Sequence, residues 1–465
     1  MESDKPSDQD SGMLYPTAAK ASHAGLRRVS SQSAKREDLF SGPTLVGPPD
    51  RLGSRSGASE MALAMEMAKH HLAESSPTST PPVSGPVTPN DIGLATTDKY
   101  AFAFDIDGVL IKGGKVIPEA IEAMRVLNGE NEFGIKVPYI FVTNGGGKTE
   151  EERCIQLSNQ LQMEVSPGQF ICGHTPMREM AEKYETVLVV GGEGEKCREV
   201  AKGYGFKDVI TPGDIIKDNE DTTPFRKLTE EERQLSHGRN YGNINIEAVF
   251  VFADSRDWAG DSQIILDLCM SKNGRLGTRS ETFDEGPPVF FSHNDVVWAT
   301  SHTYSRIGMG ALRASLEAMF RAITGKELKT VAFGKPQVGT FQFATRLLQQ
   351  WRKDTHGINR PPETVYFVGD TPESDIRGTN EFDQSGQSEA SWYSILVRTG
   401  VFQEGTRPRY MPKMTVDNVL EAVKHGMKRE FDKAIKDLTI GGGAPQLANA
   451  ITEDDDEGEE ATNVA

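Results

Sequence analysis

The segment Tyr100-Ala-Phe-Ala-Phe-Asp105-Ile-Asp107-Gly108-Val-Leu110 decides the fold of this chain. Its aromatic residues alternate with alanines, which predicts a buried β-strand. Asp105 and Asp107 follow at the C-terminal end, where open parallel sheets bind ligands, and Gly108 allows a sharp turn there. Because side chains two residues apart share a side, one carboxylate can attack a substrate atom while the other handles the proton. A solvated Asp-x-Asp-Gly turn is the alternative for this segment taken alone.

Length and charge restrict the classes of protein and partner. A chain of 465 residues has room for two or three domains. Its net charge of −17 argues against nucleic acid or an anionic membrane surface as the main partner. A phosphorylated substrate would therefore need local positive charge or a metal. No run of apolar residues approaches the length of a membrane span.

Cysteine spacing and the first residues bear on the compartment. The four cysteines form no Cys-x-x-Cys pair, so neither a zinc site nor a disulfide framework is indicated, and a reducing compartment is expected. The acidic start argues against a secretory signal. Residues 18–36 are basic, rich in Ser and Ala and free of acids, as in a mitochondrial transit peptide, although they begin late. We therefore expect an intracellular protein, mitochondrial or cytoplasmic.

The chain divides into tails, a core and an insertion. Residues 1–95 are rich in Ser, Pro and Gly and 441–465 are strongly acidic, so both are predicted to be disordered. Between them strands alternate with helices, which predicts an α/β fold around a Rossmann-like parallel sheet. Residues 96–146 and 330–440 are assigned to this core, and 147–329 to an inserted α/β cap domain. The expected strands are 100–104, 138–142, 186–190, 248–253, 289–291, 330–333, 364–368 and 394–397, and the expected helices are 118–128, 150–162, 263–270, 310–323, 338–352 and 416–437.

Three further segments place polar groups just past strands assigned to the core sheet. Thr143-Asn144-Gly145-Gly-Gly147 offers a hydroxyl, an amide and backbone N–H groups that suit phosphate. Gly334-Lys335-Pro336 offers an ammonium group that can balance a nucleophilic carboxylate. Gly369-Asp370-Thr-Pro-Glu373-Ser-Asp375 supplies extra carboxylates for Mg²⁺. Each segment alone could be an ordinary turn or loop, and their order and shared position carry the signal.

Taken together, the four segments resemble the motifs of the haloacid dehalogenase superfamily of phosphohydrolases, over about residues 98 to 425. Within it, the long insertion looks like the large α/β cap, of the C2 type, of subfamily IIA, whose members include small-molecule phosphatases. Asp257-Trp258, Asn294-Asp295-Val-Val-Trp298 and Arg306-Ile-Gly308 are similar to the cat eye syndrome critical region protein 5 branch, which is often linked to mitochondria. The two tails lie outside the resemblance.

The resemblance implies a two-step phosphoryl transfer. Asp105 would attack phosphorus to form an aspartyl-phosphate, and Asp107 would protonate the leaving oxygen and then activate water. The presence of Asp107 favours phosphatase over dehalogenase chemistry, since superfamily dehalogenases lack an acid there. The implied ligands of Mg²⁺ are Asp105, the backbone carbonyl of Asp107 and Asp370, with Asp375 as ligand or orienting group, and the implied phosphate-binding groups are Thr143, Asn144, Gly145 and Lys335.

Substrate choice would belong to the cap. Arg256 and Trp258, with Asp254 and Asp257, follow one expected strand, and Asn294 and Asp295 follow another, so either loop could face the site. Cap folding and helix capping are the alternative explanation for these residues. Gly191-Gly-Glu-Gly194 lacks the third glycine of a dinucleotide motif and is expected to be a strand-to-helix turn.

These observations favour a Mg²⁺-dependent phosphatase that acts on a small or medium-sized phosphorylated metabolite. A catalytically weak binding or regulatory protein of the same fold, tied to mitochondrial or glycerophospholipid metabolism, is the alternative. Transfer to an acceptor other than water is a third reading. No nucleic-acid partner is expected, and analogy with related enzymes suggests a homodimer formed through the cap.

Overall fold

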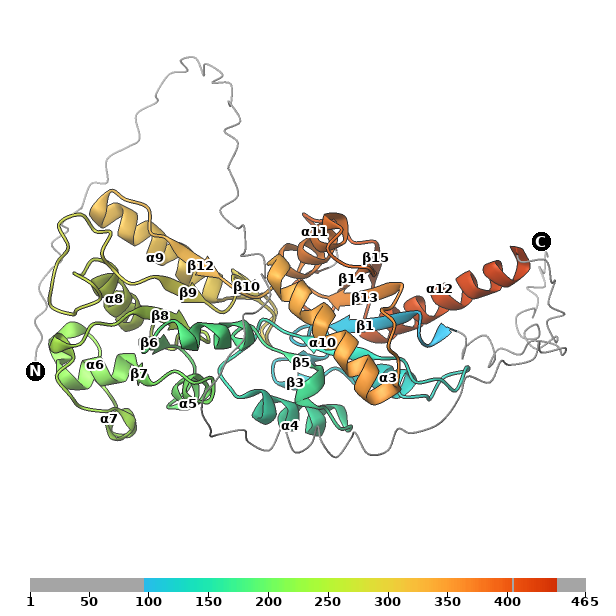
Figure 1. The fold of residues 1–465 in the computed structure, drawn as a ribbon, viewed down its shortest axis with the longest axis horizontal. Coiled ribbons are helices and arrows are strands. Elements are labelled where there is room, and N and C mark those ends of the chain that lie inside the picture. Colours follow the sequence, from blue (N-terminus) through green and yellow to red (C-terminus); the bar gives the residue numbers. More distant parts are fainter. Residues whose placement is uncertain (1–95, 404, 441–465) are drawn as a thin grey trace, which may run out of the picture. The chain divides into compact units, whose positions relative to one another are not determined.

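The core is a six-stranded parallel sheet in the computed structural model, which describes residues 96–403 and 405–440 (Figure 1). Numbered along the chain, its strands lie in the order 3-2-1-4-5-6, the Rossmann order, so the predicted fold class is confirmed. The switch point falls between the first and fourth of these strands. Across the sheet the strands are β15 (Met414–Val416), β14 (Ser391–Val397), β13 (Thr364–Gly369), β1 (Tyr100–Phe104), β4 (Tyr139–Val142) and β5 (Phe170–Ile171).

The alternating sequence of β1 decides what covers each face of this sheet. Phe102 and Phe104 belong to the apolar cluster that includes residues of α3, α4 and α12, whereas Ala101 and Ala103 face α10 and α11. A Cβ atom at Gly426 of α12 would lie 2.6 Å from the Phe102 ring, so this glycine lets the helix approach closely. The helices are α3 (Pro118–Leu127), α4 (Glu150–Leu161), α10 (Val338–His356), α11 (Arg377–Ser385) and α12 (Val419–Ile440).

The insertion forms a second parallel sheet of five strands. Its strands lie in the order 2-1-3-4-5 when numbered along the insertion, again an order of doubly wound folds. Across the sheet they are β12 (Thr330–Ala332), β9 (Val289–Phe291), β8 (Ala248–Val251), β6 (Thr186–Val190) and β7 (Asp208–Ile210). The helices are α5 (Lys196–Gly203), α6 (Pro212–Asp218), α7 (Glu230–Leu235), α8 (Trp258–Cys269) and α9 (Met309–Thr324).

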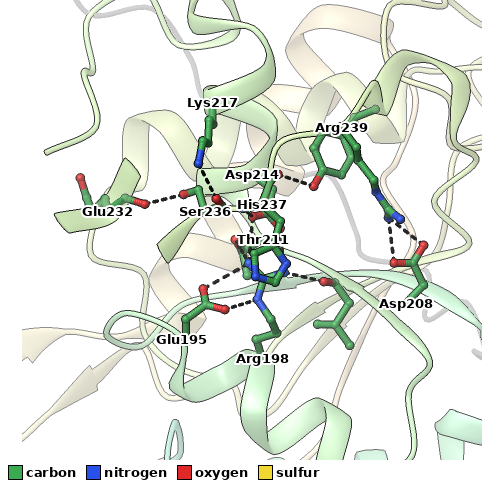
Figure 2. A network of polar contacts seen from close by, with 12 residues as sticks. Glu195, Arg198, Asp208, Thr211, Asp214, Lys217, Glu232, Ser236, His237 and Arg239 are labelled. Atoms are coloured by element: carbon green, nitrogen blue, oxygen red, sulfur yellow. Dashed lines mark hydrogen bonds and ion pairs between the residues drawn. The ribbon is translucent and has the colours of Figure 1, made fainter. Parts of the chain in front are cut away.

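A buried polar network in the cap connects helices α5 and α6 with strand β7 (Figure 2). The guanidinium of Arg198, on α5, donates to both carboxylate oxygens of Asp214 at 2.8 Å and to the carbonyl of Val209 at 2.7 Å. Glu195 forms an ion pair with the same guanidinium. Because Arg198 and Asp214 are each at most 2% exposed, this paired network fixes α5 and α6 against the end of β7.

The pairing of two short strands corrects the predicted domain boundaries. β5 pairs with β4, so the chain up to Ile171 belongs to the core sheet and not to an insertion beginning at residue 147. β12 pairs with β9, so the strand predicted at 330–333 belongs to the cap sheet and not to the core sheet. β5 has only two residues, and the composition of β12 does not reveal which sheet it joins.

Two small hairpins, β2 (Ile111–Lys112) with β3 (Lys115–Val116) and β10 (Val297–Trp298) with β11 (Arg306–Ile307), project from the core and cap. A Cβ atom at Gly113, in the first turn, would lie 2.6 Å from the backbone of Ser301, between the strands of the second. The hairpins therefore touch.

The two tails predicted to be disordered, 1–95 and 441–465, lie outside the described residues, as does the basic segment at 18–36. Within the described part of the chain, none of the helices combines the length and apolar character needed to cross a membrane.

Candidate active site

The sheet topology brings the predicted site residues to one edge. Asp105 follows β1, Thr143 follows β4 and Asp370 follows β13, and these three strands are neighbours in the core sheet. Because the strands are parallel, their carboxyl ends meet at the switch point. Asp105, Thr143 and Asp370 all line a single cavity of about 490 Å³.

A buried lysine lies between two carboxylates at the floor of the site. The Nζ atom of Lys335 is 2.7 Å from Oδ1 of Asp105 and 2.8 Å from Oδ1 of Asp375. Lys335 is 1% exposed. Burial raises the pKa of Asp105 well above its ordinary value, and the ammonium of Lys335 opposes that rise. Burial alone would lower the pKa of Lys335, but the carboxylates of Asp105 and Asp375 raise it by more. The net effect is a raised pKa, so the side chain stays charged.

Backbone N–H groups orient the two later carboxylates. Oδ2 of Asp375 accepts hydrogen bonds from the N–H groups of Asp370 and Thr371, both at 3.0 Å. Oδ2 of Asp370 accepts one from the N–H of Val401 at 2.7 Å. Burial and the nearby Asp375 raise the pKa of Asp370 to about 7. Asp375 is therefore held by three partners, counting Lys335.

The donor set fits a hard divalent cation. Asp105, Asp370 and Asp375 are buried, and each offers an oxygen within 4.8 Å of the others. Carboxylate oxygens are the preferred ligands of Mg²⁺, and a dication would offset the repulsion that raises the pKa values of Asp105 and Asp370. Cβ atoms at Gly108 and Gly400 would lie 2.1 and 1.8 Å from Oδ2 of Asp370, so only glycine leaves room for this carboxylate.

Asn144 connects the end of β4 to the backbone of Lys335. Its Oδ1 accepts a hydrogen bond from the N–H of Lys335 at 2.8 Å, and its Nδ2 donates to the carbonyl of Lys335 at 3.1 Å. Nδ2 also donates to Oδ2 of Asp295, in the cap, at 2.9 Å. The amide therefore holds the backbone of Lys335 in place, and its binding of phosphate stays a prediction.

Asp107, Thr143 and Gly145 lie together at the cavity wall. Oγ1 of Thr143 accepts a hydrogen bond from the N–H of Gly145 at 3.0 Å, which leaves the hydroxyl hydrogen to be donated. A Cβ atom at Gly145 would lie 3.2 Å from Oδ2 of Asp107. Burial raises the pKa of Asp107, and the guanidinium of Arg153 opposes this rise. A raised pKa suits a carboxyl group that must give and take a proton.

Basic residues outside the four motifs also line the cavity. Lys148 and Arg153, before and within α4, were missed by the sequence analysis, as were His293 and Trp298 in the cap. Lys148 directly follows the glycine run and Arg153 lies in the next helix, so proximity to a motif was the signal that could have identified them. Lys148 and Arg153 place positive charge in a cavity that carboxylates also line.

The predicted cap residues divide into two pairs. Arg256 and Asp295 line the catalytic cavity, as does Asp254. Trp258 instead begins α8 and packs against the apolar cluster of the cap. Asn294 is exposed and accepts a hydrogen bond from Nη1 of Arg313 at 3.2 Å.

Asp257 and the Gly191–Gly194 segment have structural roles in the cap. Asp257 caps α8, accepting from the N–H of Gly260 at 3.2 Å, and Gly191-Gly-Glu-Gly194 forms the turn between β6 and α5.

Comparisons with known proteins identify the family. Residues 102–207 match the model of the haloacid dehalogenase-like hydrolases, and residues 332–422 match a second, related hydrolase model. The chain is 39% identical over 343 residues to a cardiolipin synthase (CMP-forming)/mitochondrial hydrolase fusion protein of Schizosaccharomyces pombe, covering 73% of this chain but only 55% of that protein. It is 36% identical over 357 residues to a mitochondrial hydrolase of Saccharomyces cerevisiae, covering 72% of this chain and 97% of that protein.

Among solved structures, a p-nitrophenyl phosphatase from Archaeoglobus fulgidus matches 70% of this chain and 99% of its own, with 18% identity and a TM-score of 0.44. The assignment depends on the sequence relatives, above all on the yeast protein matched over nearly its whole length. The chain belongs to the haloacid dehalogenase-like hydrolases.

Proposed function

We propose that this protein is a Mg²⁺-dependent phosphatase that hydrolyses a phosphomonoester of a small or medium-sized metabolite. The observation that carries the proposal is the contact of Lys335 with Asp105 at 2.7 Å, where Asp105, Asp107 and Asp370 line one cavity. The ammonium of Lys335 favours the ionised form of the nucleophilic carboxylate, against the effect of burial, and a second carboxyl group lines the same cavity.

The proposed reaction has two steps. A carboxylate oxygen of Asp105 attacks phosphorus, the bond from phosphorus to the leaving oxygen breaks, and Asp107 gives that oxygen its proton. Water then attacks the aspartyl-phosphate, Asp107 takes a proton from it, and the bond from phosphorus to Asp105 breaks. The hydroxyl of Thr143 donates to a phosphoryl oxygen, and the positive charge of Lys335 stabilises the nucleophile and the transferred group.

Asp105, Asp370 and the backbone carbonyl of Asp107 would hold Mg²⁺, which when bound neutralises charge on the phosphoryl oxygens. Asp375 would orient this set through its contacts with Lys335 and the backbone of Asp370. Arg153 and Lys148 would attract the anionic substrate into the cavity.

Phosphate release from a panel of phosphorylated metabolites and an aryl phosphate, with and without Mg²⁺, tests the reaction. Asp105→Asn is expected to abolish release. Asp107→Asn should lower turnover by about 10²–10⁴-fold. With an aryl phosphate, whose leaving group needs little protonation, Asp107→Asn should still release about one equivalent of the aryl alcohol in a burst and trap the phosphorylated protein.

The matched control is Asp261→Asn, which changes a buried carboxyl group in helix α8 of the cap. This variant should keep wild-type turnover. Absence of both the burst and the phosphorylated protein in Asp107→Asn would contradict the covalent intermediate. If no substrate gives Mg²⁺-dependent release above Asp105→Asn although Mg²⁺ binds, the protein is a binding or regulatory member of the family.

Both fungal relatives are named as mitochondrial, and this supports a mitochondrial location for the present protein. Because one of them is a fusion with cardiolipin synthase, phosphorylated glycerophospholipids belong in the panel. Fractionation of cells that express the tagged full chain should place it with mitochondria, and residence in the cytosol alone would contradict this location.

A further inference from the structure

Three side chains of different metal-binding chemistry meet beside the end of β5. Glu150 is the first residue of α4, and Cys172 and His174 follow β5. Each offers one ligand atom, a carboxylate oxygen, a sulfur or a ring nitrogen, and these atoms all lie within 4.8 Å of one another. The three residues are 8%, 3% and 0% exposed, and the proposed phosphatase mechanism uses none of them.

The distance between sulfur and imidazole suits a shared metal ion. Sγ of Cys172 lies 3.5 Å from both Nδ1 and Nε2 of His174. A tetrahedral zinc ion bound to sulfur at about 2.3 Å and to nitrogen at about 2.0 Å would separate these two atoms by about 3.5 Å. Because the sulfur is equidistant from the two ring nitrogens, the Cys172 side chain must shift toward the lone pair of Nε2, away from Nδ1, for both residues to bind one ion.

Neighbouring hydroxyl groups orient the other ligands. Oη of Tyr204, which directly follows α5 of the cap, is 2.7 Å from Nδ1 of His174 and donates to Oε1 of Glu150 at 2.6 Å. Thr175 Oγ1 also donates to Oε1 of Glu150, at 2.9 Å. Hydrogen bonds of this kind fix the orientation of ligating side chains in metal sites.

The remaining conditions for metal binding concern protonation and access. Burial lowers the pKa of His174 to about 4, so its ring is neutral, the form that ligates a metal. Burial raises the pKa of Glu150, but hydrogen bonds, first that from Tyr204, lower it below its ordinary value and keep it ionised. Cys172 lines the catalytic cavity, which gives an ion a path from solvent.

We propose that Cys172, His174 and Glu150 form a second metal site, which binds Zn²⁺. Its sulfur, nitrogen and oxygen donors suit a borderline-soft ion, whereas the all-carboxylate set at Asp105 suits Mg²⁺. The thiol of Cys172 loses its proton to solvent as the ion binds. Because the His174 ring stacks on Phe252, which follows β8 of the cap, at a centroid distance of 5.4 Å, the ion would reinforce the junction between core and cap.

The test is a Co²⁺ titration of the metal-free full chain in excess Mg²⁺, followed by absorption. Cobalt reports a thiolate ligand by charge-transfer absorption in the near ultraviolet and tetrahedral geometry by intense visible bands. We expect both signals to saturate at one equivalent and to be removed by Zn²⁺ but not by further Mg²⁺. Absence of the charge-transfer signal in the wild-type protein would overturn the proposal.

Matched variants assign the ligands. Cys172→Ser should lose the charge-transfer signal, whereas Cys269→Ser, at another buried free cysteine in α8, should keep it. His174→Gln, which retains the thiol, should weaken Co²⁺ binding by at least about tenfold. A signal that persists in Cys172→Ser overturns the site. If that variant does not fold, unchanged affinity in His174→Gln overturns it instead. Activity is not measured, so the result is independent of the phosphatase proposal.

Discussion

At the residue scale, the charge balance of the candidate active site depends on Lys335. Its ammonium contacts Asp105 and Asp375, while Asp370 lies in the same oxygen cluster. Carboxyl groups in such a place have raised pKa values because burial and mutual repulsion disfavour their ionised forms. A dication bound among these carboxylates, as proposed, would relieve this electrostatic cost.

Gly400 tests how closely the Asp370 carboxylate must be held. In Gly400→Ala the new Cβ atom would lie 1.8 Å from Oδ2 of Asp370, so the carboxylate must move. Because a displacement of about 1 Å at a catalytic group can cost about 10²-fold in rate, we expect a loss of that size in Mg²⁺-dependent turnover. Steady-state kinetics and a Mg²⁺ titration measure it.

Gly339, in the first turn of α10, is the control because its added Cβ atom meets nothing within 4 Å. Gly339→Ala should keep wild-type turnover and raise the free energy of unfolding by up to about 1 kcal/mol. Wild-type kinetics in Gly400→Ala would show that the backbone adjusts and that the glycine is not needed.

Asp261 gives a pH-dependent prediction away from the catalytic floor. Burial raises its pKa to about 6, so the folded protein keeps this proton at pH values where the unfolded chain has lost it. Its contribution to stability is therefore complete below about pH 4 and is lost as the pH rises through 6. Relative to wild type, Asp261→Asn should gain about 3 kcal/mol in free energy of unfolding between pH 4 and pH 8.

Urea unfolding at pH 4, 6 and 8 measures this difference. Asp221→Asn, at an exposed position of the cap, should show the same pH dependence as wild type. A constant difference between Asp261→Asn and wild type at all three pH values would show that the folded protein does not perturb this carboxyl group.

At the element scale, strands with a strong local pattern were predictable from the sequence and short ones were not. The alternating aromatics and alanines of β1 and the apolar runs of β4 and β13 predicted both the strands and the polar groups at their ends. β5 and β15 have two and three residues and were not predicted. Composition places a residue on a strand, but sheet membership depends on pairing with distant segments.

The candidate active site was also predictable only in part. The motif residues Asp105, Lys335, Asp370 and Asp375 come together as the sequence indicated. The engagement of Asn144 with Lys335 could not be predicted, because it needs the position of a backbone 191 residues away. Cap residues could be assigned to loops but not to the cavity, since a loop's direction depends on packing of the whole domain.

The β10–β11 hairpin supplies a prediction about substrate recognition. Trp298, on β10, lines the catalytic cavity and is 39% exposed, so its ring is free to pack against the organic part of a substrate. Because it would contact the leaving group and not the reacting atoms, Trp298→Ala should raise KM for an aryl phosphate by about tenfold with little change in kcat.

The matched control is Tyr304→Ala, at a 69% exposed aromatic between the same two strands, which should keep the wild-type KM. A loss in kcat equal to the loss in kcat/KM for Trp298→Ala would instead place the ring against the transition state.

At the scale of the whole molecule, a net charge of −17 would oppose the approach of the proposed phosphorylated substrate, while Lys148, Arg153 and Arg256 would attract it inside the cavity. These two effects act over different distances. Salt shortens the Debye length from about 30 Å at 0.01 M to about 10 Å at 0.1 M and so removes long-range repulsion before it weakens contacts in the cavity.

We therefore expect kcat/KM for a phosphate dianion to rise when KCl is raised from about 0.01 M to about 0.1 M, with kcat unchanged. Initial-rate measurements at constant pH and Mg²⁺ concentration test this. A fall in kcat/KM would show that attraction by the basic residues of the cavity governs the approach.

The place of β12 has a consequence for anyone who recombines this protein with its relatives. The strand is hydrogen-bonded into the cap sheet, yet Lys335, three residues beyond it, contacts Asp105 of the core. A chimera that takes its cap from another enzyme must therefore exchange residues 186–332 as one block and rejoin the host chain before Lys335. A cut placed ahead of β12 would remove the edge strand of the donor sheet. It would also leave Lys335 without the paired strand that positions it.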